Sequence, residues 1–461
     1  MQSISENILP LPKIVIMNRE ILRIAIPNII SNITVPLMGI ASTVIAGRVA
    51  GADGATTIGA LSIGVAIFNF IYWNCSFIRM GTSGLTAQAF GAKVHKEYSL
   101  MLWRAICVAL GMGVVAFSLQ WPIGEFSLWF MSTGDAASDN MISEYFYTRI
   151  WAVPAGILLF AFNGWLTGMQ NAVAPMAVAI FVNILHVGFS YLFSIVGTMG
   201  LTGIALASVV AQWSGVGVMI VIIILLYGRK LVKVSLSEIM NLSAMQRFFQ
   251  INSDIIIRTF CLVAVYTFFT KASADMGDKN ILAVNTILLQ LFTLFSYMND
   301  GFAYAAEALT GRFIGARDAT SLRKCVKLCV VWCFVVSFIY VGVYIGWWRD
   351  IFSLLVDADT SNVEELLSVA AQYIGWIIAI PIASAMPFVM DGIMVGATRS
   401  RIMRNSMIWS SVCYFALLYG LGWIIGNNAI WLAFTSFMFL RGLFQYFMSH
   451  QLRDIYTEAQ R

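Results

Sequence analysis

The chain has 461 residues and a net charge of +5, and it is 59% hydrophobic but only 11% charged. A soluble domain carries roughly 25% charged residues, so this composition excludes an ordinary soluble globular protein and predicts a protein that crosses a membrane many times. The modest positive charge does not indicate a nucleic-acid partner. The seven cysteines are odd in number and lie in or beside apolar stretches, so they do not predict a disulfide framework.

Apolar runs long enough to span a bilayer follow a short polar N-terminus. Residues 1–23 lack the basic start and cleavable apolar core of a signal peptide and are expected to form a retained cytoplasmic tail. A span needs about 20 mostly apolar residues. Twelve spans are predicted, with kinks expected at Pro154, Pro381 and Pro387: 24–47, 58–80, 99–122, 145–169, 174–198, 203–228, 248–273, 281–309, 326–348, 366–396, 404–426 and 429–450.

The positions of Lys and Arg predict the orientation of these spans. The N-terminus, the even-numbered loops and the C-terminal tail together carry nineteen basic residues, whereas the opposite side carries only Arg48, Lys279 and Arg349. Cytoplasmic loops are enriched in Lys and Arg. Both termini are therefore expected in the cytoplasm.

Two pairs of similar segments divide the chain into halves. LTAQAFGAK (85–93) and LTGRFIGAR (309–317) each follow an even-numbered span, 224 residues apart, and GWLTG (164–168) has an echo in GIMVG (392–396). Because six is an even number, two six-helix copies enter the membrane from the same side. The sequence thus predicts an all-α membrane protein with twelve transmembrane helices in two six-helix lobes related by a pseudo-two-fold axis along the membrane normal. The expected boundaries are 24–228 for the N-lobe, 229–247 for a cytoplasmic linker, 248–450 for the C-lobe and 451–461 for a cytoplasmic tail.

Two such lobes around a cavity are typical of a transporter that works by alternating access, not of an enzyme. No GxxxxGK[ST] segment is present, so direct ATP hydrolysis by this chain is not expected. A major-facilitator transporter also has two six-helix halves, but the segment after the second span, GTSGLTAQAFGAK, lacks the usual acidic and basic motif of that family.

Four segments resemble the multidrug and toxic compound extrusion (MATE) family, and specifically its DinF-like bacterial branch. They are FNFIYWNCSFIRMGTSGLTAQAFGA (68–92), GWLTGMQNAVAPM (164–176), NDGFAYAAEALTGRFIGARD (299–318) and FVMDGIMVGATRSRIMRNSM (388–407). The resemblance implies an antiporter that exports amphipathic organic compounds in exchange for protons or sodium, with no other cofactor. We expect it to work as a monomer among the lipids of a bacterial inner membrane, with no nucleic-acid partner.

The first half departs from the pattern of that branch at two acidic positions. Where the resemblance implies an acid in the first span, this chain has Ser42 in GIAST (39–43), and where it implies one in the fifth span, it has Ser190. Asn183, which is also typical of the cluster, is present. The two carboxylates that the resemblance implies for proton coupling in the N-lobe are therefore missing.

Ionisable residues within the other half are functional candidates, because charge is costly inside a bilayer. At 1.5 Å per helical residue, Arg258 and Asp300 fall at similar depths of roughly 14–15 Å, and Asp254 lies one turn from Arg258. We expect an Asp254–Arg258–Asp300 cluster, serving either as a static ion-pair network or in proton exchange and substrate contact. Asp391 is a further coupling candidate. For both Asp391 and Glu307, however, capping or loop contacts near span ends are favoured.

His186 stands inside the apolar run VNILHVGFSY (182–191). Asn183, His186 and Ser190 share one helix face, and with Ser42 and Thr43 they are expected to line the N-lobe cavity. An imidazole titrates near pH 6.5, so His186 is a candidate to replace the missing acids. The alternative is a neutral histidine that is hydrogen-bonded to Asn183 or Ser190.

Gln290 and Tyr297 are expected to line the substrate cavity. Two other functions remain open at this stage. A flippase for a lipid-linked headgroup would need a markedly basic cavity, and a transport-dead scaffold would show no flux.

Overall fold

A computed structural model describes residues 13–49, 54–132, 134–355, 363–450 and 452–460. Most of these residues are helical, and no strand occurs among them. The first half contains α1 (Lys13–Ala46), α2 (Gly54–Cys75), α3 (Phe77–Gly91), α4 (His95–Ser118), α5 (Gln120–Met131), α6 (Ala136–Arg149), η1 (Ile150–Ala152), α7 (Val153–Gly168), α8 (Val173–Tyr191), η2 (Leu192–Val196) and α9 (Gly200–Tyr227). The second contains α10 (Leu236–Ile239), α11 (Leu242–Asp275), α12 (Lys279–Gly315), α13 (Ala319–Leu355), α14 (Val363–Gly396), α15 (Ser400–Ile425), α16 (Asn427–Met448) and α17 (Arg453–Glu458).

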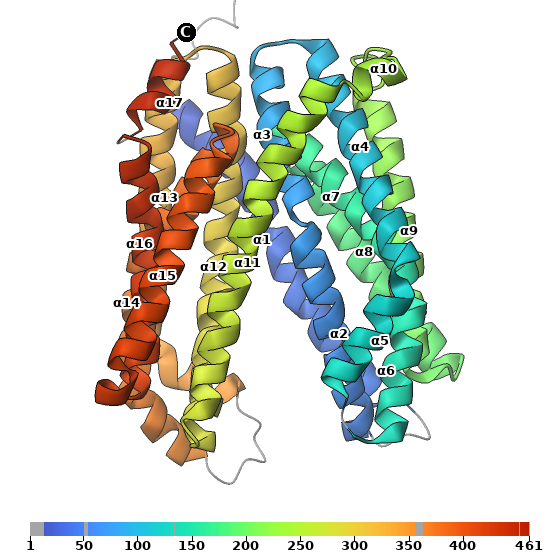
Figure 1. The fold of residues 1–461 in the computed structure, drawn as a ribbon, viewed down its shortest axis with the longest axis vertical. Coiled ribbons are helices and arrows are strands. Elements are labelled where there is room, and N and C mark those ends of the chain that lie inside the picture. Colours follow the sequence, from blue (N-terminus) through green and yellow to red (C-terminus); the bar gives the residue numbers. More distant parts are fainter. Residues whose placement is uncertain (1–12, 50–53, 133, 356–362, 451, 461) are drawn as a thin grey trace, which may run out of the picture.

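The helices form two side-by-side lobes, α1–α9 and α11–α16, which approach each other at one end and diverge at the other (Figure 1). This confirms the predicted all-α, two-lobed membrane fold. Among the described residues, eleven helical segments are long and apolar enough to cross a membrane. α16, at the position of the twelfth predicted span, is a continuous helix that packs against α14 and α15, but its apolar run is interrupted by the buried polar side chains Arg441 and Gln445.

Several of the predicted spans consist of two helical segments with a break between them. The second consists of α2 and α3, which meet at Ser76, and the third consists of α4 and α5, which meet at Leu119. The fourth is broken by a 3₁₀ turn immediately before Pro154, where a kink was predicted. A proline inside a helix removes one backbone hydrogen bond, so a break at this point is expected. α14 contains both Pro381 and Pro387.

Helix ends differ from the predicted boundaries in ways that matter for the site. α1 already begins at Lys13, so the expected tail is helical from there, while residues 1–12 lie outside the described residues. The second span continues to Gly91 instead of ending near residue 80, and α12 continues to Gly315 instead of ending near 309. Polar residues in both extensions lower the local hydropathy, which made these spans look shorter than they are.

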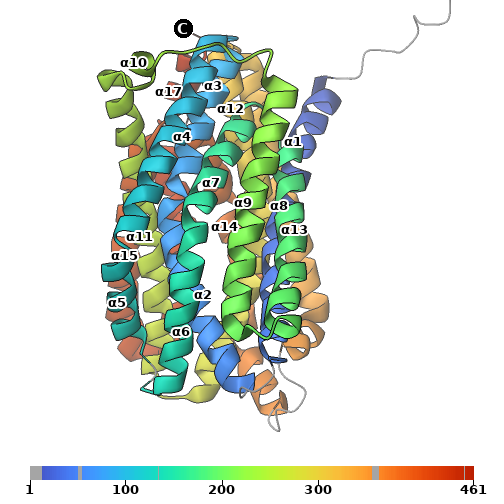
Figure 2. The same cartoon turned by 90° about the vertical axis from the view of Figure 1, so that its right-hand side faces the viewer.

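The linker between the lobes is mostly not helical. Its only helix among the described residues is the four-residue α10, which begins with a capping box between Ser235 and Glu238, and α11 then starts at Leu242. Glu238 also forms an ion pair with Lys96 of α4, and so the linker is tied to the N-lobe. We call the end of the molecule that carries this linker and the 92–94, 316–318 and 397–399 loops the basic face. Figure 2 shows the same bundle from the side, with α8 and α9 packed together.

Candidate functional site: a charged cavity between the lobes

A cavity of about 930 Å³ lies between the two lobes. Its walls come from α1, α2, α3, α7, α8 and α9 on one side and from α11, α12, α14, α15 and α16 on the other. Aromatic and aliphatic side chains form much of the lining, including Tyr72, Trp73, Phe160, Leu262, Tyr266, Leu289 and Phe388. A space of this size with an apolar lining and a few polar groups is typical of a small-molecule site.

Close backbone packing seals the lobes together at the basic face. A Cβ atom at Gly91 would overlap the carbonyl oxygen of Arg312, and a Cβ atom at Gly315 would overlap that of Gln88. These four positions belong to the repeated segments 85–93 and 309–317, so the two copies pack on each other symmetrically. Gly84 makes a similar approach to the carbonyl of Val395 across the lobes, whereas Gly396 packs on the carbonyl of Glu307 within the C-lobe. Only glycine permits contacts this close.

Side-chain hydrogen bonds and one ion pair reinforce this seal. Gln88 donates to the carbonyl oxygen of Gly396 at 3.0 Å, and Gln170 donates to that of Ala308 at 2.8 Å. Arg312 forms an ion pair with Glu20 at 2.6 Å. Each contact joins an N-lobe helix or the loop after α7 to a C-lobe helix. The structure is therefore closed at the basic face.

Asp391 of α14 is the centre of a buried ion-pair network in the C-lobe. Its Oδ2 accepts a hydrogen bond from Arg258 of α11 at 2.5 Å and lies 3.3 Å from Nη2 of Arg441 of α16. Its Oδ1 accepts a hydrogen bond from Gln445 at 2.6 Å. The expectation that Asp391 makes capping or loop contacts is therefore wrong. One carboxylate holds two arginines of neighbouring helices in the cavity wall.

A second charged pair joins the two lobes. Arg79 of α3 lies 3.5 Å from Glu307 of α12, and its guanidinium stacks over the ring of Tyr304 at 4.1 Å from the ring centre. Arg79 was predicted at the very end of the 58–80 span, as one of the nineteen basic residues of the cytoplasmic side, and Glu307 was expected to make capping or loop contacts near a span end. The expectation for Glu307 is wrong and Arg79 does not end its span, because α3 and α12 continue past these residues and bring them into the cavity wall.

Asp300 of α12 lines the cavity between these two pairs. Arg79, Arg441 and Arg258 all lie within electrostatic range of its carboxylate. Among the described residues, however, no hydrogen bond or ion pair to this carboxylate is found. Asp391 and Glu307 take the direct contacts of the surrounding arginines. Asp300 is thus the acid in this cluster that is left open to the cavity.

Asp254 does not belong to this cluster, so the predicted Asp254–Arg258–Asp300 arrangement is wrong. Its carboxylate forms an ion pair with Arg404 at 2.6 Å and accepts a hydrogen bond from Ser400 at 2.8 Å, both on α15. One turn further along α11, Arg258 instead meets α14. Asp254 and Arg258 therefore each pair with a neighbouring helix, and they do not pair with each other.

His186 is buried between α1, α8 and α9, outside the lining of the central cavity. Its Nε2 lies 3.1 Å from Ser42 Oγ and 3.5 Å from Ser190 Oγ, and its Nδ1 lies 3.3 Å from Ser208 Oγ. The two serines that replace the expected acids are therefore both partners of the histidine. Ser208 was not anticipated from the sequence.

The other N-lobe candidates are separated from one another. Asn183 does line the cavity, where it donates to Thr34 Oγ1 at 2.8 Å and not to His186. Thr43 is exposed, and its hydroxyl donates to the carbonyl of Gly39. Neither Thr43 nor Ser42 nor Ser190 is part of the cavity lining. Only one of the four residues expected to accompany His186 at the cavity is found there.

The two further cavity candidates, Gln290 and Tyr297, both line it. Sequence reasoning missed Arg441 and Gln445, although both interrupt the apolar run FMFLRGLFQYFM, which was the signal available. No group of three or more His, Cys, Asp or Glu side chains that could hold a metal ion occurs in the part of the chain that the structure describes.

Comparisons with known proteins agree with this architecture. The family model described as MatE matches residues 27–192 and again residues 255–420. The chain is 32% identical to the DNA damage-inducible protein F of Escherichia coli (strain K12) over 431 residues, which cover 92% of this chain and 90% of that protein. It is 23% identical over 229 residues to a probable multidrug resistance protein NorM of Thermotoga maritima, covering 48% of this chain and 47% of that protein.

Solved structures share the fold at low sequence identity. An outward-facing conformation of a multidrug resistance MATE family transporter superposes with a TM-score of 0.84 at 15% identity, covering 96% of this chain and 97% of that chain. A transporter from Pyrococcus furiosus, described as having a binding pocket of reverse polarity, superposes with a TM-score of 0.83 at 15% identity over the same shares. The double match of the family model fits the duplication seen in the two packed repeats.

Proposed function

Since this chain belongs to the MatE family of membrane transporters, we propose that it is a cation-coupled antiporter that exports amphipathic organic compounds by alternating access. The proton is the proposed coupling ion. The basic face lies in the cytoplasm together with both termini, as the distribution of Lys and Arg predicts. The structure is then open away from the cytoplasm, and the working unit is a monomer in a bacterial plasma membrane.

The observation that carries this proposal is the open carboxylate of Asp300. A carboxylate within a bilayer that lacks a direct partner gains or loses a proton at low cost to the surrounding structure, because no ion pair must break. Three arginines and three acids are found among the described residues that line the cavity: Arg79, Arg258, Arg441, Asp300, Glu307 and Asp391. The lining is neutral with Asp300 ionised and carries one positive charge after it is protonated.

This change of charge supplies a physical basis for coupling. The cavity has two charge states, with Asp300 ionised or protonated. A ligand that binds one of these states more tightly shifts the equilibrium between the two lobe arrangements. The two pairs around Asp300, Arg258–Asp391 and Arg79–Glu307, keep their own charges balanced. The Arg79–Glu307 pair also joins the lobes, so this contact must change when the lobes move. A proton taken up at Asp300 alters the electric field at this pair.

His186 is not our choice for the proton carrier. It lies away from the cavity, and serines contact both of its ring nitrogens. This arrangement fits the alternative of a neutral, hydrogen-bonded histidine that holds α1 against α8 and α9.

The cavity lining favours a small amphipathic solute over a lipid-linked headgroup. A flippase for such a headgroup would need a markedly basic cavity, whereas arginines and acids here are equal in number. Among the described lining residues, the N-lobe contributes no acid and one charged side chain, Arg79. The N-lobe wall therefore does not select for organic cations, and a neutral or anionic amphipath remains within the proposal.

Flux in proteoliposomes tests this function. The purified protein is given an imposed pH gradient with a cationic dye or an anionic amphipath inside, and the same measurement is repeated with a sodium gradient. Asp300→Asn is expected to abolish the dependence of flux on pH, while Asp275→Asn, which removes a carboxylate from an exposed pair with Lys271, leaves it intact. Flux driven only by sodium contradicts proton coupling, and absence of flux with every solute favours the transport-dead scaffold.

A further inference from the structure

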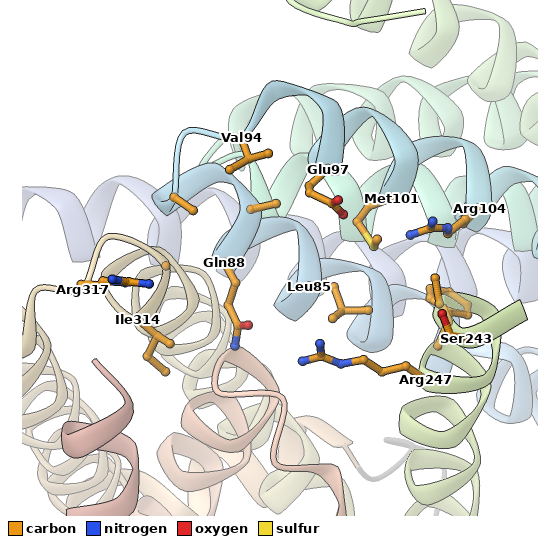
Figure 3. A pocket seen from close by; sticks show the side chains of 15 residues that line it. Leu85, Gln88, Val94, Glu97, Met101, Arg104, Ser243, Arg247, Ile314 and Arg317 are labelled. Atoms are coloured by element: carbon orange, nitrogen blue, oxygen red, sulfur yellow. The ribbon is translucent and has the colours of Figure 1, made fainter. Parts of the chain in front are cut away.

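A second pocket, of about 710 Å³, lies at the basic face and is separate from the central cavity. Its walls come from the end of α3, the start of α4, the first turns of α11 and the end of α12 (Figure 3). α3 and α4 belong to the N-lobe and α11 and α12 to the C-lobe. The pocket is therefore built jointly by the two lobes, beside the seal that Gly91 and Gly315 form.

Three arginines and one acid make the lining of this pocket basic: Arg104, Arg247, Arg317 and Glu97. Arg104 is only 5% exposed, and its guanidinium donates to the carbonyl oxygens of Ile239 and Glu238 at 3.1 and 2.9 Å. Its Nη1 has no partner among the described residues. A buried arginine that is held in place by the linker and keeps one free nitrogen is prepared to bind an anion.

Arg247 and Arg317 approach the same space from the other lobe. Both are exposed, and neither side chain makes a hydrogen bond or ion pair with any residue that the structure describes. Figure 3 shows Arg247 extending from α11 toward Leu85 and Gln88, while Arg317 follows the end of α12. Three positive charges with free donors thus surround a pocket that contains one carboxylate.

Apart from Gln88 and Ser243, the remaining lining has no polar side chain. Leu85, Met101, Phe248 and Ile314 line the pocket. Next to it, the first turns of α11 present Leu242 and Phe249, which are 72% and 52% exposed. Large apolar side chains that remain exposed at the end of a transmembrane helix are suited to contact with acyl chains.

We propose that this pocket binds the phosphate headgroup of an anionic membrane lipid from the leaflet at the basic face. Arg104, Arg247 and Arg317 contact the phosphate, and the apolar lining and the exposed side chains at the start of α11 contact the upper part of the acyl chains. Basic pockets between transmembrane helices bind anionic headgroups in this way. A soluble anion would gain from the arginines but not from the lipid-facing apolar surface.

Because both lobes build the pocket, the lipid has a preferred conformation. Arg104 moves with the N-lobe, whereas Arg247 and Arg317 move with the C-lobe. The headgroup contacts all three arginines only while the lobes are closed at the basic face. A ligand that binds one state better stabilises that state, so the bound lipid favours the closed arrangement seen here.

The test compares lipid binding by the full chain and by two matched double variants. Native mass spectrometry of the detergent-solubilised protein measures affinity for phosphatidylglycerol, with phosphatidylcholine as the uncharged reference. Arg247→Gln/Arg317→Gln is expected to bind phosphatidylglycerol about 30-fold more weakly, as two contacts of about 1 kcal/mol each predict. Arg229→Gln/Lys233→Gln removes the same charge from exposed residues of the basic face outside the pocket and is expected to change binding less than threefold, which is about 0.65 kcal/mol.

Other results would overturn the proposal. Equal weakening by both double variants would mean attraction to the basic face as a whole, and equal affinity of the wild type for the two lipids would exclude a headgroup site. The second comparison needs no variant, so it holds even where a variant fails to fold. Inorganic phosphate that raises the melting temperature as much as phosphatidylglycerol does would show that the anion need not come from a lipid.

Discussion

Gly91 and Gly315 occupy equivalent positions in the two repeats, and each packs against a backbone carbonyl of the other repeat. Gly91 meets the carbonyl of Arg312, and Gly315 meets that of Gln88. The repeated segments that predict the duplication from the sequence are therefore also the surfaces at which the two lobes close. Small residues let transmembrane helices approach at backbone distance.

Replacing Gly91 by valine is expected to prevent this closure, because its Cβ would occupy the space of the Arg312 carbonyl oxygen. Transport should fall at least tenfold, and a cysteine placed at the buried Thr86 should react faster with a water-soluble maleimide than it does with Gly91 present. Gly111→Val is the matched control, since nothing lies within 4 Å of a Cβ at that helical glycine. Unchanged transport and labelling in Gly91→Val would show that the seal tolerates a side chain.

The network around Asp391 predicts an order of stabilities. Asp391→Asn leaves Arg258 and Arg441 facing each other without a carboxylate, whereas Arg258→Gln leaves Asp391 still in contact with Arg441 and Gln445. Removing one partner of a buried pair typically costs about 3–5 kcal/mol, because the other charge stays buried. We therefore expect a larger drop in melting temperature for Asp391→Asn than for Arg258→Gln in the same detergent.

The double variant Arg258→Gln/Asp391→Asn sharpens this test. Its melting temperature should lie above that of Asp391→Asn, since only one arginine then lacks a carboxylate. Strictly additive losses would mean that Arg258 and Asp391 do not act as a pair.

His186 and its three serines give a prediction that separates packing from coupling. His186→Leu would leave the hydroxyls of Ser42, Ser190 and Ser208 without their shared partner. A buried polar group without a hydrogen bond costs about 1–3 kcal/mol, although Ser42 and Ser208 also donate to backbone carbonyls. The melting temperature should therefore fall modestly. Flux driven by a pH gradient should remain.

His186→Asn is the gentler comparison, because it keeps a polar side chain within reach of some of the serines. A folded His186→Asn protein that transports without any response to the pH gradient would assign proton coupling to the N-lobe. Our choice of Asp300 would then be wrong.

The spans and the two lobes were predictable because hydropathy and repeated segments depend on sequence alone. The ends of α3 and α12 were not, since close packing of small and polar residues continues each helix beyond its apolar run. Because of this error, Arg79 and Glu307 were expected at span ends and not in the cavity wall. Hydropathy alone does not mark the ends of the spans at the places where the lobes touch.

The proximity of Arg258 and Asp300 was predictable, whereas the choice of partner was not. Both residues line the cavity, as their similar distances along the two helices suggest. The rotation of each helix decides which neighbouring charge a side chain meets, and spacing along one helix does not contain that information. For this reason Asp254 pairs with Arg404 and Arg258 with Asp391.

Glu238 in the linker gives a prediction about pH. An ion pair with Lys96 and hydrogen bonds from Ser235 lower the pKa of Glu238 from 4.5 to about 2. A carboxyl group whose pKa is lower in the folded protein stabilises the fold at pH values above its unfolded pKa. This contribution is lost as the pH falls from about 4.5 to about 2.

The melting temperature of Glu238→Gln should thus lie below that of the wild type at neutral pH, and the two should converge on acidification through that window. The pair is solvent-exposed, so added salt should also reduce the difference. Glu364→Gln, which removes an acid from the first turn of α14 at the opposite end of the bundle, is the control for a general effect of charge. A difference that stays constant down to the lowest pH would mean that Glu238 acts through the geometry of its capping box and not through its charge.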